Sequence, residues 1–342
     1  MAGAMADMSQ RRRGLAKGSG MKVYLVGKRR AITNWLEDTE AGLRAAGHEV
    51  RTGIFRNPSL APTLNRLLLA EAAGAPLSRL VAADMRRFKP DIIIVVSAVK
   101  TPLEPLARLR RAAKGVPMVG WVGDVFDESH KPLSALLDLV AYTDSRFFEL
   151  HAQLGLTTPA IFLPHAVSPA DRLPAAAPRD PAMAFVANPT PGRLALIGAV
   201  KTPLALYGPG WSASAQAPHQ VFARRYSPAE VQQLYARHAA VLNIRHEKNV
   251  LSGLNQRNFS PCLQGAAVIT DWQDDLERCF EPGTEVLAYR DADGLNELYA
   301  RVRAEPEFAA RIGARGQARV LGEHLFGHRL ERLRAELGLR AG

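Results

Sequence analysis

The sequence predicts an α/β protein made of two Rossmann-like domains. The chain has 342 residues, more than the roughly 250 to 300 at which a single hydrophobic core usually stops growing. Strand-like and helix-like segments alternate along almost all of it, as expected for doubly wound parallel sheets. A stretch rich in Pro and Ala and without periodicity, residues 168–181, interrupts the alternation and predicts a linker.

The first half begins with a βαβ pattern. An apolar run over 21–27 ends in Gly27, a helical stretch covers Trp35 to Ala46, and a second strand is predicted at 48–53. The continuous β-branched run at 90–96 predicts a strand buried on both faces of a parallel sheet. The other elements predicted in this half are two helices on either side of Gly74-Ala75-Pro76, helices at 103–114 and from Ser145, and strands at 117–122, 139–143 and 160–167.

The same alternation starts again after the linker. The predicted elements are strands at 183–188, 203–208, 240–245, 266–270 and 285–289, and helices around Pro191, from Ser227, at 256–264 and from Asp293 onward. We therefore expect a disordered leader over 1–20, a first domain over 21–167 and a second domain over 182–325. The segment 326–342 is a candidate to pack back on the first domain, because its leucines need a surface that covers them.

Composition and charge limit the classes of function. No apolar run approaches the roughly 20 residues of a membrane span, and residues 1–20 lack the apolar stretch of a secretory signal. Cys262 and Cys279 do not have the spacing of a zinc site or of a disulfide framework, and we expect reduced thiols in a cytoplasmic protein. The net charge of +11 favours an anionic partner, which is a nucleotide diphosphate, an anionic membrane surface or nucleic acid.

Three candidate site residues lie at the ends of predicted strands in the first half. Gly27 is one, but the residues after it lack the GxGxxG spacing of a dinucleotide site, which disfavours a nicotinamide dehydrogenase; a plain turn residue is its alternative. Asp124 leads a cluster with Asp127, Glu128 and His130 and could serve as a general base, or could cap a helix. His165 also follows a strand, and a structural histidine is its alternative role.

Two junctions between strand and helix in the second half could take a phosphate or a sugar. The loop from Asn188 to Arg193 precedes a helix whose free N–H groups and dipole favour an anion. Tyr207, Gly208 and Trp211 form a glycine turn with aromatic side chains that suit a base or a sugar pocket. Ordinary turn chemistry explains the same glycines.

A third junction opens the helix at 256–264 with polar residues around an arginine. The guanidinium of Arg257 suits a diphosphate, although a surface helix with an arginine there by chance is the competing interpretation. The residues of this junction are Asn255, Gln256, Arg257, Asn258 and Phe259.

In their order, these segments resemble those of GT-B glycosyltransferases, in particular the branch of the spore-maturation CgeB-like proteins with their carboxy-terminal glycosyltransferase group 1 domain. The resemblance spans most of 21–337 and is strongest from Ala240 to Leu333. The segments that carry it are WVGD at 121–124, FVANPTPGR at 185–193, LYGPGW at 206–211, LNIR at 242–245, NQRNF at 255–259 and the region from QGAAVITD at 264–271 to RLERL at 329–333.

The resemblance implies two Rossmann-like domains that face each other across a cleft. It also implies transfer of a glycosyl group from a nucleotide diphosphate sugar, bound mainly by the second domain, to an unidentified acceptor (glycan, protein or small molecule) held mainly by the first. Asn243 and Arg245 of LNIR then join the donor site. Arg193, Arg257 and helix-end amides would stabilise the departing diphosphate without a metal ion, and no cofactor besides the donor is expected. Asp124 is the candidate base of an inverting reaction, and retaining chemistry stays open.

The chain departs from the family pattern at two positions. Ser260 stands where these proteins usually carry a Glu that is thought to bind the donor ribose, and a hydroxyl cannot clamp two ribose hydroxyls as a carboxylate does. Asn188 replaces the usual Gly. The alternative function is therefore a GT-B-like binding module without turnover, which uses its basic surface for nucleic acid or another anion. A metal-dependent GT-A enzyme would need Asp291-Ala-Asp293, which capping of a helix explains better.

Overall fold

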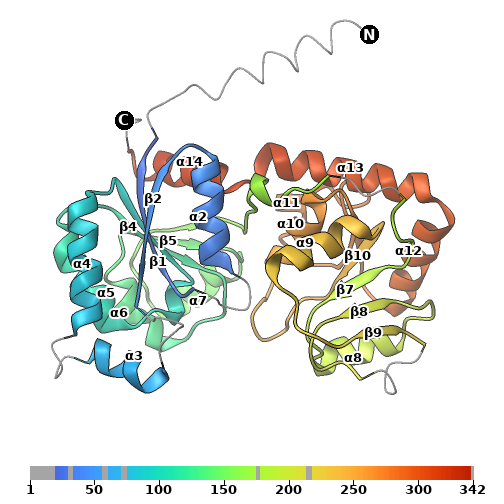
Figure 1. Ribbon diagram of the computed structural model, residues 1–342, viewed down its shortest axis with the longest axis horizontal. Helices are drawn as coiled ribbons and strands as arrows, with labels where there is room; N and C mark the ends of the chain where they lie inside the picture. The colour runs from blue at the N-terminus through green and yellow to red at the C-terminus, as the bar shows by residue number, and fades with distance from the viewer. Residues whose placement is uncertain are drawn as a thin grey trace, which may run out of the picture.

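The computed structural model of the protein describes residues 20–29, 34–55, 61–70, 75–174, 178–212 and 218–339. The leader expected over 1–20 lies outside these residues, apart from Gly20, and so does part of the expected linker. The described residues form two α/β domains side by side, each with a six-stranded parallel sheet (Figure 1). The two-domain α/β fold predicted from the sequence is confirmed.

The sheet of the first domain has the strand order β2-β1-β3-β4-β5-β6. All five residues of β3 and of β4 are buried, as the β-branched run predicts for central parallel strands. The strands are β1 (Lys22–Gly27), β2 (Glu49–Ile54), β3 (Ile92–Val96), β4 (Met118–Val122), β5 (Leu139–Tyr142) and β6 (Ala160–Phe162). The helices are α2 (Trp35–Ala45), α3 (Pro62–Leu69), α4 (Pro76–Phe88), α5 (Leu103–Ala113), α6 (Lys131–Ser134) and α7 (Phe147–Gln153).

The sheet of the second domain has the order β12-β11-β10-β7-β8-β9. Its strands are β7 (Ala184–Val186), β8 (Ala205–Tyr207), β9 (Gln220–Phe222), β10 (Ala240–Asn243), β11 (Ala267–Asp271) and β12 (Leu287–Tyr289). Its helices are α8 (Pro191–Gly198), α9 (Pro228–Arg237), α10 (Gln256–Leu263), α11 (Leu276–Cys279), α12 (Ala292–Ala304) and α13 (Pro306–Glu323). Strand β9 was not predicted from the sequence, because this edge strand has three residues and buries none of them fully.

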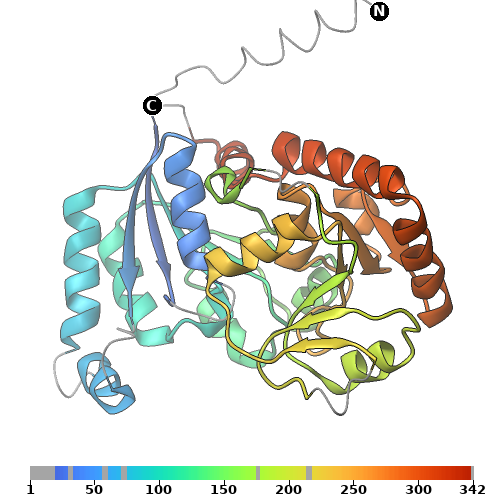
Figure 2. The same cartoon turned by 45° about the vertical axis from the view of Figure 1, so that its right-hand side comes forward.

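The last helix, α14 (Phe326–Glu336), returns to the first domain and lies beside α2 (Figures 1 and 2). Phe326, Leu330 and Leu333 are each 1% exposed, within the hydrophobic cluster on one face of the first sheet. Just before this helix, Val167 and Leu325 form an isolated parallel bridge. The chain therefore crosses between the domains twice, and the two crossings are joined by hydrogen bonds.

Both sheets direct the carboxyl ends of their strands toward the interdomain space. In each sheet the chain reverses its winding direction, at β1 in the first and at β7 in the second, and ligands of open α/β sheets bind at such points. Within the described residues, no helix combines the length and the apolar character that crossing a membrane requires.

Candidate functional site

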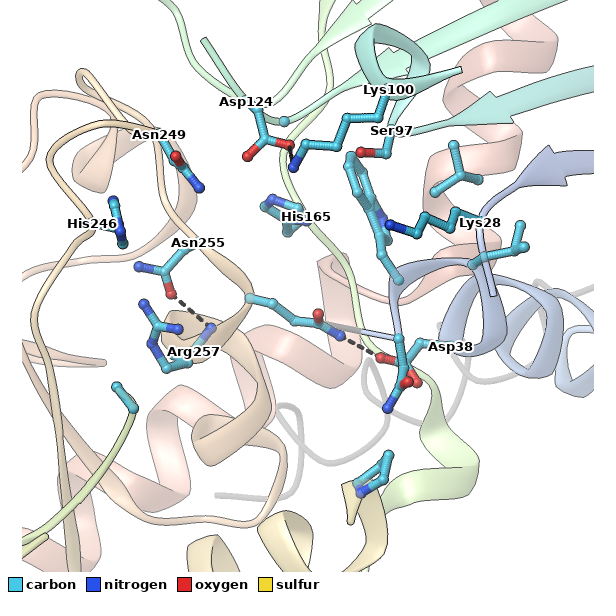
Figure 3. Close-up of a pocket in the computed structure, with 18 of the residues that line it drawn as sticks. Lys28, Asp38, Ser97, Lys100, Asp124, His165, His246, Asn249, Asn255 and Arg257 are labelled. Carbon is cyan, nitrogen blue, oxygen red and sulfur yellow. Dashed lines mark hydrogen bonds and ion pairs between the residues drawn. The ribbon is translucent and has the colours of Figure 1, made fainter. Parts of the chain in front are cut away.

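A cavity of about 1630 Å³ lies between the two domains (Figure 3). It is large enough for a nucleotide sugar together with part of an acceptor, since ligand pockets commonly measure about 300 to 1,000 Å³. Most of the predicted site residues line it: Gly27, Asp124, His165, Asn188, Arg193, Tyr207, Gly208, Asn255, Arg257 and Ser260. The junctions at Asn188, Gly208 and Asn255 thus meet at one edge of the second sheet.

Asp124 and Lys100 form the polar part of the first-domain wall. Their side chains are 2.7 Å apart, and the Asp124 side chain is 19% exposed. Lys100 ends a short 3-10 helix (Ala98–Lys100) after β3, and the residue before this helix, Ser97, is a non-glycine residue with φ of 55°. Of the acidic cluster predicted here, Asp124 alone lines the cavity. Asp127 instead caps a turn by accepting from the Ser129 N–H, and His130 is buried.

His165 lies next to Asp124 on the same wall and packs against Trp35, with ring centroids 4.5 Å apart. Burial lowers the pKa of His165 to about 4, an effect that Asp124 opposes and Arg329 adds to. The imidazole is therefore neutral near pH 7. Neither His165 Nδ1 nor Trp35 Nε1 has a hydrogen-bond partner among the described residues, so the wall has unused polar atoms close to the cavity.

The start of α10 forms the opposite wall. The Asn255 side chain accepts from the Arg257 N–H at 2.9 Å, and the Asn258 side chain accepts from the Asn255 N–H, which completes a capping box. Arg257 Nε donates to Asn243 Oδ1 at 3.2 Å. In the part of the chain that the structure describes, Arg257 makes no ion pair, so its remaining guanidinium N–H groups are available to an anion.

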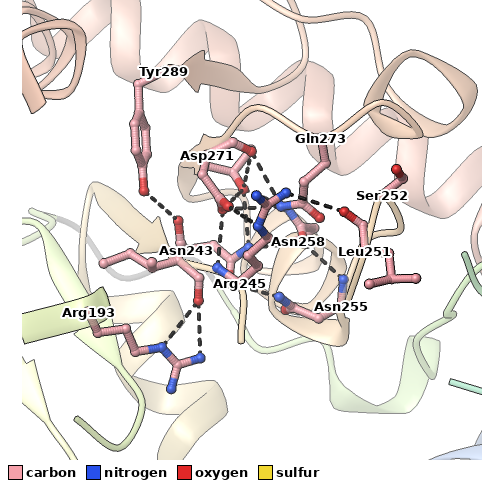
Figure 4. Close-up of polar contacts among 12 residues, drawn as sticks. Arg193, Asn243, Arg245, Leu251, Ser252, Asn255, Asn258, Asp271, Gln273 and Tyr289 are labelled. Carbon is pink, nitrogen blue, oxygen red and sulfur yellow. Dashed lines mark hydrogen bonds and ion pairs between the residues drawn. The ribbon is translucent and has the colours of Figure 1, made fainter. Parts of the chain in front are cut away.

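Arg193 lines the cavity, but most of its donors are occupied. Its guanidinium donates to the carbonyls of Asn188 and Ile244, and the residue is 3% exposed (Figure 4). Burial lowers its pKa to about 10, and the nearby positive charge of Arg257 contributes. Arg193 therefore ties the loop after β7 to the end of β10. The direct contact with a diphosphate that we expected is replaced by the electrostatic field of its positive charge in the cavity.

The glycine turn after β8 and its aromatic neighbours line another part of the cavity. Tyr207 stacks on Phe222 at 4.7 Å and hydrogen-bonds to His238. Gly208 has φ of 141°, and an added Cβ would lie 2.6 Å from the Ala187 carbonyl oxygen, so only glycine fits. The aromatic ring of Tyr226 meets Tyr207 edge-on.

Five predicted donor-site residues support the cavity wall and do not line it. Trp211 turns inward to bond the Ala187 carbonyl, Phe259 is fully buried in the core, and Arg245 pairs with Asp271 at 3.5 Å. Asn243 and Asn258 form a buried amide network with Thr270 (Figure 4). We correct their expected role from direct contact to support, because these side chains are occupied by contacts inside the second domain.

Other residues that line the cavity were not predicted from the sequence, chiefly Lys28, Asp38, Lys100 and Tyr235. Asp38, in the first turn of α2, accepts from Gln256 Nε2 at 2.6 Å across the cleft (Figure 3). Burial raises the pKa of Asp38 to about 7, with Asp171 and Glu37 adding to the effect and the Gln256 bond opposing it. A carboxylate in the first turn of a helix is common for electrostatic reasons, so the sequence alone gave no signal of this contact.

The Asp291-Ala-Asp293 segment lies outside the cavity. Asp291 caps α12 by accepting from the Gly294 N–H at 2.9 Å. Across the described residues, no group of three or more His, Cys, Asp or Glu side chains is arranged to hold a metal ion.

Comparisons with known proteins address the fold and the second domain. The family model "Glycosyl transferase-like" matches residues 193–335. No curated protein matches the chain. Among solved structures, Anabaena Alr3699/HepE in complex with UDP has a TM-score of 0.64 at 12% identity, covering 93% of this chain and 100% of that one.

Two further structures are similar over the whole chain. Sucrose-phosphate synthase from Thermosynechococcus elongatus has a TM-score of 0.63 at 13% identity, covering 93% of this chain and 99% of that one. An α,α-trehalose-phosphate synthase (UDP-forming) from Burkholderia vietnamiensis has a TM-score of 0.62 at 11% identity, covering 92% and 99%. The chain therefore has the GT-B fold, and its residues 193–335 match the glycosyl transferase-like family model.

Proposed function

We propose that this protein is a glycosyltransferase that moves a sugar from a nucleotide diphosphate sugar to an acceptor in the interdomain cavity. The observation that carries the proposal is the position of Arg257. It lies at the capped start of α10, makes no ion pair within the described residues, and faces Asp124 and His165 across the cavity. A cation at a helix N-terminus suits a diphosphate leaving group, and a carboxylate on the opposite wall suits an acceptor hydroxyl.

Each wall has a distinct part in the proposed reaction. Arg257, at the positive end of the α10 dipole, binds the diphosphate and stabilises the charge that develops as the glycosidic bond breaks. The aromatic side chains around Tyr207 line the part of the cavity that is available to the nucleobase of the donor. Asp124 accepts the proton of the acceptor hydroxyl in an inverting transfer, while neutral His165 donates or accepts a hydrogen bond beside it. A retaining transfer would leave Asp124 as a binding residue.

The structural neighbours support this choice of donor. Anabaena Alr3699/HepE has been solved with UDP and with UDP-glucose. We propose UDP as the first nucleotide to test. The segments given above support the further proposal that the chain belongs to the CgeB-like branch. The non-catalytic alternative draws on the net charge of +11.

Calorimetric titration with UDP, ADP, GDP and dTDP tests the proposal. We expect one of them to bind with a micromolar dissociation constant. The glucose derivative of the nucleotide that binds should be slowly hydrolysed by the protein. Salt-dependent binding of RNA or DNA, with no nucleotide bound, would favour the binding module instead.

The proposed reaction uses protein cations for the leaving group. We therefore expect EDTA to leave nucleotide binding unchanged. Loss of binding in EDTA, restored by manganese, would show that a metal ion holds the diphosphate.

A further inference from the structure

The segment Leu251–Gln256, which leads into α10, is held at both ends by the first domain. At its start, the Leu251 and Ser252 N–H groups donate to Asp144 Oδ2 at 2.8 and 2.9 Å. At its end, Gln256 Nε2 donates to Asp38 Oδ2 at 2.6 Å. The two carboxylates come from different elements, the loop after β5 and the helix α2, so the second domain's segment is attached to the first domain at two separate points.

The contact at Asp144 is buried and fully paired. Asp144 is 2% exposed, and its second oxygen accepts from the Arg146 N–H at 3.0 Å. Three N–H donors around one carboxylate compensate for its desolvation. An asparagine could not replace it, because its NH₂ group would face at least one of these donors.

The middle of the segment approaches the backbone of the first domain closely at Gly253. A Cβ added at Gly253 would lie 2.6 Å from the Thr143 carbonyl oxygen and 2.8 Å from Asp144 Cα. The backbone of the segment therefore approaches the end of β5 as closely as the absence of a side chain permits.

The segment ends in the residues of the proposed diphosphate site. Asn255 caps α10, and the Asn243 side chain accepts from both Asn255 Nδ2 and Arg257 Nε. Moving the segment would displace the cap and the guanidinium together.

We propose that Asp144 and Asp38 are positioning residues of the donor site: from the first domain they fix the segment Leu251–Gln256, and through it Asn255 and Arg257. The inference rests on the proposed function and extends it, because the diphosphate site then becomes complete only when the two domains are together. Neither carboxylate needs to touch the donor.

The test compares three variants in UDP titrations, each at a temperature where circular dichroism shows it folded. Asp144→Asn and Gly253→Ala should each raise the dissociation constant of UDP by about tenfold, which corresponds to the loss of roughly one charge-assisted hydrogen bond. Asp138→Asn is the control. Asp138 also accepts from a backbone N–H and from an arginine, but it lies outside the cavity lining, so this variant should lower thermal stability and leave UDP affinity unchanged.

Gly253→Ala alters no charge and no polar group, but Gly253 lines the cavity, so weaker UDP binding in this variant counts as positioning only if the Leu251 and Ser252 amides also exchange faster. If Asp144→Asn weakens UDP binding and Gly253→Ala does not, Asp144 acts on the ligand itself and the inference is overturned. It is also overturned if both variants lower only the melting temperature.

Hydrogen exchange at the Leu251 and Ser252 amides gives a readout that needs no ligand. These amides should be protected in the wild type and in Asp138→Asn, and should exchange faster in Asp144→Asn. Protection that is unchanged in Asp144→Asn would contradict the attachment itself. If these amides lose protection in Asp144→Asn but the wild-type protein binds none of the nucleotides, the attachment is supported and the proposed function fails.

Discussion

At the residue scale, Arg257 has the clearest assigned task. Replacing it with alanine removes the guanidinium that faces the cavity, and losing a charge-assisted hydrogen bond typically costs about 1.5 to 3 kcal/mol, or roughly ten- to a hundredfold in affinity. We expect that loss in UDP affinity, with partial recovery in Arg257→Lys, because an ammonium cannot reproduce the bidentate geometry.

Arg290→Ala is the matched control for this prediction. Arg290 belongs to the same domain and covers the Trp272 ring at 4.1 Å, outside the cavity lining. If both alanine variants weaken binding equally, the general positive charge binds the nucleotide and Arg257 has no special part.

Asp38 gives a prediction about pH. Its pKa is raised by burial from 3.8 to about 7 in the folded protein, so the folded state binds more protons than the unfolded state between these values. The stability contributed by the protonated group is therefore present below about pH 4 and is lost as the pH rises toward 7. Asp38→Asn should flatten this part of the profile of unfolding free energy against pH, measured with urea at several pH values. Parallel profiles for the two proteins would assign the titration to another group.

At the scale of elements, the start of α10 depends on a buried amide network. Asn258 is fully buried, accepts from the Asn255 N–H and from Asn243 Nδ2, and donates to Thr270 Oγ1 at 2.9 Å. Asn258→Ala leaves these partners unsatisfied, so we expect the free energy of unfolding to fall by about 1 to 3 kcal/mol.

The control for the network is Asn296→Ala, which removes an amide whose bonds are largely exposed to solvent. It should cost less than Asn258→Ala in the same urea titration. A larger effect of Asn296→Ala would mean that water replaces the network at little cost.

The sequence predicted elements better than it predicted which side chains face the cavity. Buried β-branched runs and capping residues such as Ser227 located most strands and helices, because these signals are local. The positions of the strand-to-helix junctions follow from the sequence, yet the Arg193 side chain points toward carbonyl groups and the Phe259 side chain toward the core. Those directions depend on packing between elements. The contact of Asp38 with Gln256 depends on how the two domains are placed, which no local pattern encodes.

At the scale of the whole molecule, the last helix completes the core of the first domain. Phe326 packs so closely on α2 that a Cβ added at Gly42 would lie 2.4 Å from its ring. Phe326→Ala should lower the free energy of unfolding by about 3 to 5 kcal/mol. Hydrogen exchange at the β1 amides should become faster in this variant, although the substituted residue lies far from β1 in the sequence.

Phe308→Ala is the counterpart in α13, where the side chain packs in the core of the second domain. Its effect on exchange should appear in that domain's strands. If Phe326→Ala loosened the second domain alone, α14 would not be a structural part of the first.

The paired crossings at Val167 and Leu325 have a mechanical consequence. The Val167 N–H donates to the His324 carbonyl at 3.0 Å and the Phe326 N–H donates to the Val167 carbonyl at 3.3 Å, so two covalent connections run next to each other at one side of the interface. Two adjacent connections define a line about which the domains can rotate, while they resist twisting and sliding. Any opening of the domains would then follow a single angular coordinate, and the parts of each domain farthest from the Val167–Leu325 bridge would move the greatest distance.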